Sequence, residues 1–255
     1  MAGGAARIAA VAAVCLVSAG RAFAEEREAR VTRAEGAVTV VSQKEETSVQ
    51  LGDDEDLPLE TGDRVRTGAD GAAEITLDGE TVMELGPGSD FTVKSLERSN
   101  LFFGLDLGRL VATVKALLPQ DKMEIHTPVC VAAVRGTEFA VTQSAEGETE
   151  VGVFDEGQID VAGGGETVRI GANQETSVGR GRAPRRPQAL RRLAVHRKRV
   201  LFARERRKHF AVAWRARPPQ QRKALRHQFI KNERKHPRGP APKPRKNHKS
   251  PARRK

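Results

Sequence analysis

The sequence lacks several residue types on which common classes of function depend. Of its 255 residues none is tyrosine, one is tryptophan and two are cysteine, and aromatic residues make up 4%. So few aromatic side chains make a surface platform for sugars or nucleic-acid bases hard to build. Cys15 falls in the first 24 residues, so a chain without them keeps only Cys130 and has no intramolecular disulfide. We expect Cys130 to be a small buried residue, with a reactive thiol or a disulfide-linked dimer as the alternatives.

No apolar run reaches the roughly 20 residues that a membrane-spanning helix needs. An uncharged, mostly apolar run of 13 residues follows Arg7 and precedes Ala22-Phe23-Ala24, which offers small residues to a signal peptidase. We therefore predict that residues 1–24 are a secretory signal peptide and that the mature protein is exported to the periplasm. An uncleaved anchor and a lipoprotein modified at Cys15 are the alternatives.

Acidic residues are nearly absent from the end of the chain. Residues 181–255 contain 28 Lys and Arg against 2 Asp and Glu, a net charge of +26. Residues 25–180 contain 14 basic against 31 acidic residues, a net charge of −17. The overall charge of +11 therefore describes neither part. The change of sign predicts an acidic folded domain over 25–180 and a basic low-complexity tail over 181–255.

The acidic part has the pattern of an all-β domain. Short alternating segments lie between turn residues, and they start about 8–12 residues apart, as in a sandwich, barrel or solenoid. Asp78-Gly79 between two such segments predicts a hairpin. Strands are expected at 37–41, 72–77, 80–85, 90–94, 109–115, 122–126, 129–134, 137–143, 149–154, 157–161 and 166–170. The phenylalanines of the domain are expected in its core: Phe91, Phe102, Phe103, Phe139 and Phe154.

The basic tail has weak helical patterns. Apolar residues are scattered through 188–216, and Pro218-Pro219 would end a helix there. A second helix is expected from 219 to about 233, with Leu225 and Phe229 one turn apart. Residues 237–255 combine Pro, Lys and Arg with almost nothing to bury and are expected to be disordered.

One segment of the acidic part is more specific than the rest. Thr127-Pro128 precedes an apolar stretch whose two faces, Val129/Val131/Ala133 and Cys130/Ala132/Val134, both predict burial. Arg135-Gly136-Thr137-Glu138-Phe139 follows, in which Gly136 allows a sharp bend. Arg135 and Glu138 bracket this bend, and we expect a charged pair there that fixes local structure. A partner-binding role for Arg135 is the alternative.

This segment resembles the hallmark of the FecR domain family. Two upstream stretches also resemble the family, and their turn positions are Gly62, Asp63, Gly68, Asp78 and Gly79. The resemblance covers roughly residues 31–178. The best-known members are envelope-spanning regulators that hold a sigma factor on the cytoplasmic side. Here a signal peptide stands in place of that domain, so the resemblance implies an exported stand-alone FecR-domain protein. An all-β fold, solenoid-like or sandwich, is expected.

The sequence offers little for catalysis, metals or cofactors. His126 is the one histidine of 25–180, and no familiar nucleophile motif surrounds a serine. His126 and Cys130 would lie roughly 13 Å apart along a strand, too far to share a metal ion. Asp53-Asp54-Glu55-Asp56 lacks the spaced ligands of a calcium loop and is expected to be a solvated acidic loop. We expect no enzyme activity, no metal and no cofactor.

The tail is the candidate for binding an anionic surface. In an envelope, anionic lipid, lipopolysaccharide and acidic wall polymers are the available partners. Nucleic acid becomes the leading partner only if the chain is not exported. Two further interpretations are a tail that lies on its own acidic domain and leaves for a competitor, and a solvated tail without a partner. The candidate surface-binding residues are Arg191, Arg192, Arg197, Lys198, Arg199, Arg206, Arg207 and Lys208.

Two functional hypotheses follow. The first is a non-enzymatic envelope binding or scaffolding protein, whose β domain holds an unknown protein or glycan and whose tail attaches to an anionic surface. The second is a periplasmic sensory or regulatory module that relays a signal to a membrane partner.

Overall fold

The computed structural model describes residues 26–42, 45–51, 55–115, 117–118 and 121–235. The predicted signal peptide, Asp53 and Asp54 of the acidic loop, and the predicted disordered end (237–255) lie outside the described residues.

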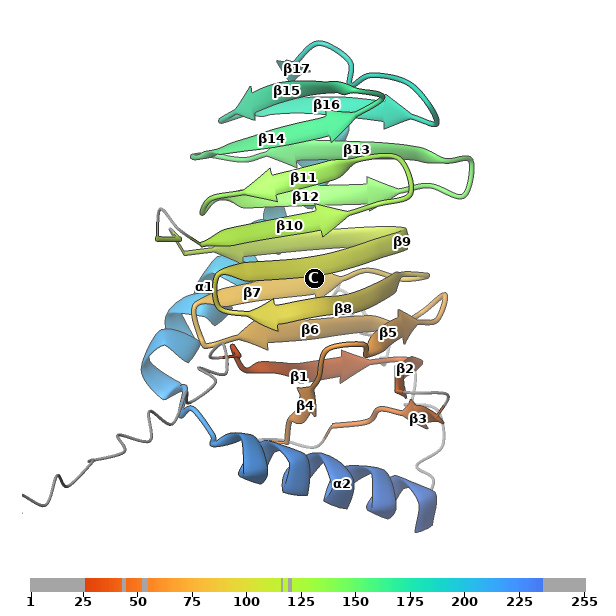
Figure 1. Ribbon diagram of the computed structural model, residues 1–255, viewed down its shortest axis with the longest axis vertical. Coiled ribbons are helices and arrows are strands. Elements are labelled where there is room, and N and C mark those ends of the chain that lie inside the picture. Colours follow the sequence, from red (N-terminus) through yellow and green to blue (C-terminus); the bar gives the residue numbers. More distant parts are fainter. Residues whose placement is uncertain (1–25, 43–44, 52–54, 116, 119–120, 236–255) are drawn as a thin grey trace, which may run out of the picture.

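Seventeen strands form one hydrogen-bonded sheet that folds into two facing layers (Figure 1). Sheet A consists, in spatial order, of β3 (Glu45–Ser48), β2 (Val38–Ser42), β5 (Arg64–Thr67), β8 (Asp90–Glu97), the first half of β9 (Asn100–Val114), β10 (Lys122–His126), β11 (Val131–Val134), β14 (Gln158–Gly163) and β15 (Glu166–Gly171). Sheet B consists of β4 (Leu57–Leu59), β1 (Ala29–Glu35), β6 (Ala72–Leu77), β7 (Thr81–Leu85), the second half of β9, β12 (Glu138–Gln143), β13 (Glu148–Val153), β16 (Gln174–Gly179) and β17 (Gln188–Ala189). The prediction of an all-β domain is confirmed, as a two-layer sandwich.

The long strand β9 joins the two layers. It pairs with β8 and β10 up to Leu107, and with β7 and β12 from Gly108 onward. Gly108 has a φ of +92°, and a Cβ at this position would lie 2.5 Å from the Cα of Ser89. Only glycine fits this backbone and this close approach. The sequence pattern predicted only the second half of β9, from residue 109.

The main core lies between the two sheets. Alternate side chains point inward from each strand, and the rings of Phe91 and Phe103 stack there with centroids 5.5 Å apart. The prediction that all five phenylalanines are buried is wrong for Phe102, which lies partly exposed beside the imidazole of His126. Phe154 is fully buried, but outside this core, on the outer side of sheet B.

The predicted hairpin is present, and several strands were missed. Asp78 and Gly79 both have positive φ, and β6 pairs with β7 across them. Strands β3, β4, β5 and β17 escaped the pattern, because strands of two to four residues carry almost no periodicity. The missed strands are β1, β3, β4, β5, β16 and β17.

The strand expected over 129–134 begins only at Val131. Thr127 to Cys130 form a tight turn instead, closed by hydrogen bonds of 2.9 Å from Thr127 N to Cys130 O and 3.1 Å from Cys130 N to Thr127 Oγ1. The prediction that both faces are buried is also wrong. Ala132 and Val134 point into the core, whereas Val131 and Ala133 lie on the partly exposed outer face of sheet A.

The C-terminal part is helical and packs against the sandwich. A 3₁₀ helix, η1 (Leu193–His196), leads into α1 (Arg197–Ala213), which lies on the outer face of sheet B against β7 and β9. Trp214 turns into an extended conformation and ends α1. Helix α2 (Pro219–Lys235) begins at a proline, which suits a first helical position, and lies across one end of the sandwich beside β4 and β3 (Figure 1).

Candidate functional site

The outer face of sheet B carries a set of buried or partly buried carboxylates. We call this the acidic face; it consists of Glu74, Glu84, Glu138, Glu150 and Glu175. Glu74, Glu138 and Glu175 are 3%, 4% and 2% exposed, although they point away from the core. The segment that covers them is the stretch 190–217, which we call the strap. Its arginines meet the carboxylates one by one.

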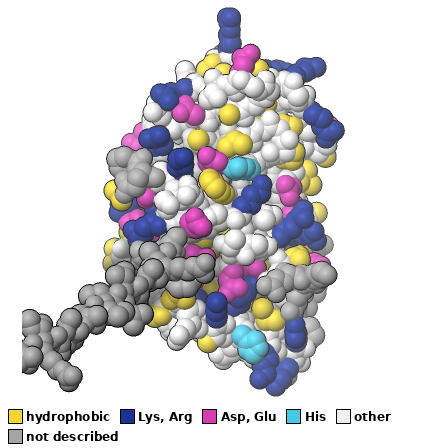
Figure 2. Space-filling view, viewed as in Figure 1, with side chains coloured by type: hydrophobic (Ala, Val, Ile, Leu, Met, Phe, Trp, Pro, Cys, Tyr) yellow, Lys and Arg dark blue, Asp and Glu magenta, His cyan; other side chains and the backbone are white. Residues whose placement is uncertain are grey.

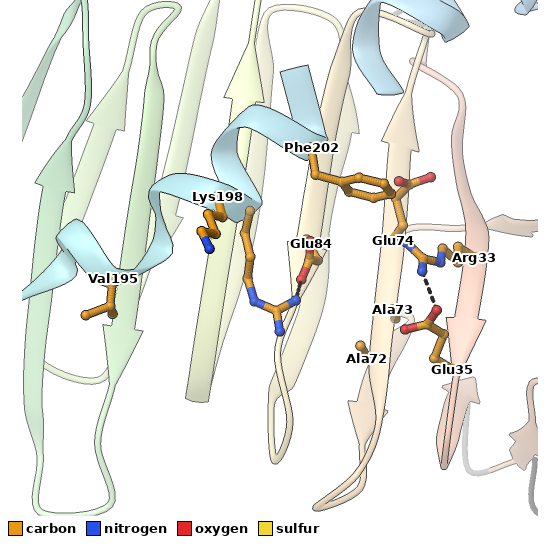
Figure 3. A pocket seen from close by; sticks show the side chains of 10 residues that line it. Arg33, Glu35, Ala72, Ala73, Glu74, Glu84, Val195, Lys198 and Phe202 are labelled. Carbon is orange, nitrogen blue, oxygen red and sulfur yellow. Dashed lines mark hydrogen bonds and ion pairs between the residues drawn. The ribbon is translucent and has the colours of Figure 1, made fainter. Parts of the chain in front are cut away.

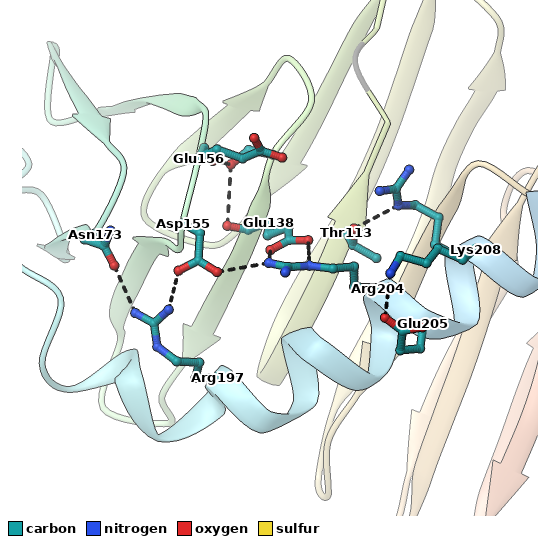
Figure 4. Close-up of polar contacts among 11 residues, drawn as sticks. Thr113, Glu138, Asp155, Glu156, Asn173, Arg197, Arg204, Glu205 and Lys208 are labelled. Carbon is teal, nitrogen blue, oxygen red and sulfur yellow. Dashed lines mark hydrogen bonds and ion pairs between the residues drawn. The ribbon is translucent and has the colours of Figure 1, made fainter.

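Arg204 makes the most central of these contacts (Figure 4). Its Nε donates to Oε1 of Glu138 at 2.6 Å, and its Nη2 contacts both the second oxygen of Glu138 and, at 3.0 Å, Asp155. Arg197 also donates to Asp155 and, at 2.9 Å, to Oδ1 of Asn173. Hydrogen bonds from Arg197 and Arg204 lower the pKa of Asp155. Paired guanidinium and carboxylate groups of this kind form short, charge-assisted hydrogen bonds.

The neighbouring strands repeat this arrangement. Arg206 donates from Nη2 to Oε1 of Glu74 at 2.8 Å and from Nε to Oε2 at 3.0 Å, and Arg199 pairs with Glu84. At the other end of the strap, the backbone N–H of Leu193 donates to Glu175 at 3.0 Å. Glu175 thereby accepts from the free N–H groups that open η1.

An apolar contact lies within this ionic frame. Val111, Ala140 and Phe154 from sheet B pack with Leu193 and Val200 of the strap, and all five are buried. Because α1 buries only Val200 and Ala203, its apolar stripe is short. The strap is therefore held by ion pairs around a small apolar centre.

The far end of the strap is fixed by its single tryptophan. The guanidinium of Arg30 lies 3.9 Å from the centre of the Trp214 ring, a cation–π contact. On its other side the tryptophan reaches the predicted hairpin turn, where a Cβ on Gly79 would lie 2.6 Å from that of Trp214. Arg217 then donates to Asp56 at 2.8 Å. Gly79 thus serves both the turn and the docking of the strap.

Helix α2 is tied to the sandwich by a buried ion pair. The Nη1 and Nη2 atoms of Arg226 donate to the two carboxylate oxygens of Asp63 at 2.6 and 2.8 Å. The two side chains are 7% and 2% exposed. Nη1 also donates to the carbonyl of Pro58 at 2.8 Å, and Phe229 packs against the main core. This helix covers the end of the sandwich and closes it.

His196 lies in a strongly cationic part of the interface. Burial and the nearby charges of Arg109 and Arg199 lower its pKa to about 4. Arg109 lies directly over Gly86, where a Cβ would meet its guanidinium at 2.4 Å. Burial and Arg199 also lower the pKa of Arg109. His196 is therefore neutral at physiological pH.

A groove of about 460 Å³ runs beside α1 over strands β1, β6 and β7 (Figure 3). Val195 and Phe202 line it from the strap, and Ala72 and Ala73 form part of its floor. Among its charged groups, Arg199 pairs with Glu84 and Arg33 with Glu35, and Lys198 is exposed. The groove therefore offers a mixed surface, apolar between charged groups.

The comparison with protein families agrees with the sequence pattern. A family model described as FecR protein matches residues 63–160. Residues 63–160 are therefore a FecR domain. A search of curated proteins finds no match. Two crystal structures named "putative anti-sigma factor" from Parabacteroides distasonis, at 2.50 and 1.65 Å resolution, are each 16% identical with a TM-score of 0.46. Each alignment covers 52% of this chain and 62% of the other, less than two thirds of its length.

The predicted hallmark lies where the FecR domain crosses from one sheet to the other. Gly136, with a φ of +108°, turns the chain from β11 in sheet A to β12 in sheet B. Thr137 donates to the carbonyl of Glu156, and Phe139 is fully buried in the core. The prediction that Arg135 pairs with Glu138 is wrong. Arg135 is exposed, and Glu138 is held by Arg204 of the strap.

The other hallmark residues and the predicted turn residues also hold the backbone in place. Thr127 and Pro128 belong to the turn that precedes β11, and the hydroxyl of Thr127 lies 2.8 Å from that of Thr149. Gly62 has a φ of +96°, and its N–H donates to Val93 O at 2.7 Å. Gly68 receives N–H groups from Gly71 at 3.0 Å and Gly88 at 2.9 Å. Asp63 and Gly79 differ, because each also contacts the C-terminal part.

Most of the predicted surface-binding cations are engaged within the chain. Five reach side chains of the domain: Arg192, Arg197, Arg199, Arg206 and Arg207 contact Glu150, Asp155, Glu84, Glu74 and Thr113. Lys208 pairs with Glu205 on α1 at 2.8 Å (Figure 4). Arg191 and Lys198 are exposed. Sequence reasoning missed Arg204, Arg217 and Arg226. The opposite charges of residues 25–180 and 181–255 were the one signal that these arginines could bind the domain.

The residues considered for chemistry lie apart from this interface. His126 Nε2 is 2.7 Å from Glu124 on the outer face of sheet A. Cys130 is buried with its sulfur 3.4 Å from Thr127 Oγ1, and burial raises the pKa of its thiol. Within the described ranges, no group of three or more His, Cys, Asp and Glu side chains is placed to hold a metal ion. None of the helices described is both long and apolar enough to cross a membrane.

Proposed function

We propose that this chain is an exported, non-enzymatic binding protein of the cell envelope. Its FecR domain recognises a protein or glycan, and its cationic C-terminal part attaches it to an anionic surface. The observation that carries the proposal is the strap on the acidic face. The buried carboxylates there are used to hold a polypeptide segment through matched charges, which is a binding arrangement and not a reactive one.

The proposal assigns the two sheets different roles. The strap occupies the outer face of sheet B, so a partner of the domain meets the outer face of sheet A. That face presents Phe102 beside His126, ring centroids 5.6 Å apart, next to the half-exposed Val131 and Ala133. A small apolar centre with polar neighbours is the usual composition of a protein-binding surface.

The test is fractionation of cells that produce the full chain with a tag after Lys255. We expect a product without residues 1–24 by mass spectrometry, located outside the cytoplasm, that sediments with envelopes at low salt and is released at high salt. A product of unchanged mass in the cytoplasm would contradict export. An exported product that never sediments would contradict surface attachment.

A regulatory role is the second candidate, and the ionic character of the strap favours it. A strap held mainly by arginine–carboxylate pairs can be replaced by another arginine-rich segment that offers the same contacts. In this role the strap covers sheet B until a membrane partner supplies a competing basic segment. The competitor then takes the acidic face and the strap is released.

A synthetic peptide copying residues 192–217 tests this role. A spin label on Val212→Cys reports release of the strap, because Val212 is 77% exposed whereas Cys130, the other cysteine of a mature chain, is buried. We expect the label to become mobile as the peptide is added. A peptide of the same composition in scrambled order is the control. An immobile label at saturating peptide would refute exchange of the strap.

A further inference from the structure

The end of the sandwich that α2 covers carries positive charge on its outer surface. The inward side of α2 contains Arg222, Leu225, Arg226, Phe229 and Glu233, which are all wholly or partly buried. The opposite side contains Lys223, His227, Lys231 and Lys235, which are all exposed. These positions are four apart and share one side of the helix, so the four groups form one stripe along it.

Acidic residues are scarce on this helix. Glu233 is the one carboxylate of α2, and it is 6% exposed. On the face of the molecule that Figure 2 shows, basic and acidic side chains are interspersed over the body, and Lys, Arg and His side chains gather at the lower end. The outer surface of α2 therefore differs from the strap, whose arginines are mostly paired with the domain.

The shape of this surface suits a planar partner. Helix α2 has 17 residues, so it is roughly 25 Å long, and it lies across one end of the longest axis of the molecule (Figure 1). The cations run from its first turns to its last residue. Phe229 of α2 packs inward, so the outer side has no large apolar side chain to insert into a hydrocarbon layer, and His227 is the one aromatic ring on it that a base could stack on.

We propose that the outer side of α2 binds the phosphate groups of an anionic phospholipid bilayer and sets the sandwich upright on the membrane. This rests on the proposed function, which it deepens by naming the surface and its partner. The contact is peripheral and electrostatic. It leaves Phe102 and His126 on the outer face of sheet A open to a partner in the same compartment.

The experiment is co-sedimentation of the full chain with vesicles of phosphatidylcholine alone or with 30% phosphatidylglycerol. The variant Lys223→Gln/Lys231→Gln/Lys235→Gln removes three charges from the stripe. We expect its partition into anionic vesicles to fall at least about 30-fold, since each Lys near an anionic surface contributes several-fold to binding. The matched control, Arg186→Gln/Arg191→Gln/Lys198→Gln, removes three exposed cations elsewhere and should retain most of the binding.

The outcomes separate the two proposals. If the wild-type chain ignores anionic vesicles altogether, surface attachment through the cationic part fails, and this inference fails with it. If the wild-type chain binds but both triple variants lose the same amount of binding, net charge alone is responsible, and α2 is not the membrane-binding surface. Binding to a DNA duplex that is equal to vesicle binding and equally sensitive to the α2 variant would show a general polyanion surface and overturn the assignment to a bilayer.

Discussion

The buried pair of Arg226 and Asp63 gives the sharpest test of whether α2 belongs to the folded unit. The substitution Arg226→Met keeps an unbranched apolar stem and removes the charged guanidinium. It leaves the Asp63 side chain, which is 2% exposed, with the N–H of Glu60 at 2.7 Å as its remaining donor among the described residues. Removing one partner of a buried ion pair costs about 3–5 kcal/mol, because the other charge stays buried without compensation.

The free energy of unfolding in urea, followed by circular dichroism, measures this loss. A loss of this size lowers the midpoint of thermal unfolding by roughly 6–20 °C for a chain of this length. Lys223→Met is the matched control, since it removes an exposed charge from the same helix, and should change the stability by less than about 0.5 kcal/mol. The double variant Arg226→Met/Asp63→Asn should recover part of the loss, because it removes the uncompensated charge.

The reasoning would be refuted if Arg226→Met unfolded within about 0.5 kcal/mol of the wild type. It would also be refuted if α2 melted in a separate early transition while the sheets kept their stability. Either result would mean that α2 rests on the sandwich without contributing to it.

Three further predictions concern the strap, the sheet crossing and pH. In a double-mutant cycle, Glu138→Gln and Arg204→Gln should show a coupling energy of about 1–3 kcal/mol in urea unfolding, and additive effects would mean that the pair is not formed. Gly108→Ala should cost at least about 1–3 kcal/mol, since φ is +92° and Ser89 leaves no room for a Cβ, and an unchanged midpoint would contradict the crossing of β9. The imidazole of His196 should titrate near pH 4 by NMR. Because this folded pKa lies below the unfolded value near 6.5, His196 adds stability above pH 6.5 that is lost as the pH falls toward 4, and His196→Asn should remove this part of the pH profile.

The sequence predicted the sandwich itself better than the site on it. The alternation of apolar and polar residues, together with the turn residues, was sufficient to predict β6, β7 and their Asp78-Gly79 turn, because each of these signals is local. The apolar run predicts a strand from residue 129, whereas Val129 and Cys130 belong to the turn that begins at Thr127, since an apolar run does not show where pairing starts. Strands β1 and β16 pair with strands that are distant in the sequence, and their own residues give few local signals of a strand.

The site depended on contacts that no local pattern contains. Glu138 was assigned to Arg135, three residues away, whereas its partner Arg204 is 66 residues away and on another element. The opposite charges of the two parts indicated that they could meet, but not which arginine meets which carboxylate. For the same reason the change of sign near residue 180 predicts a boundary there, and a tail that lies on the acidic domain is only one of several interpretations that the sequence allows. Separation there would expose Val111, Ala140 and Phe154 and leave the acidic face without its counter-charges.

The central claim is that ion pairs on the acidic face hold the strap, and amide hydrogen exchange tests it most directly. A helix as short as α1, with a weak apolar stripe, is marginal in water by itself. In the wild-type chain, the amides of Arg197–Ala213 should be protected. In the variant Glu74→Gln/Glu84→Gln/Glu138→Gln, their protection should fall at least about tenfold while that of β9 is retained. Unchanged protection of α1 in this variant, or an unprotected α1 in the wild type, would contradict the account.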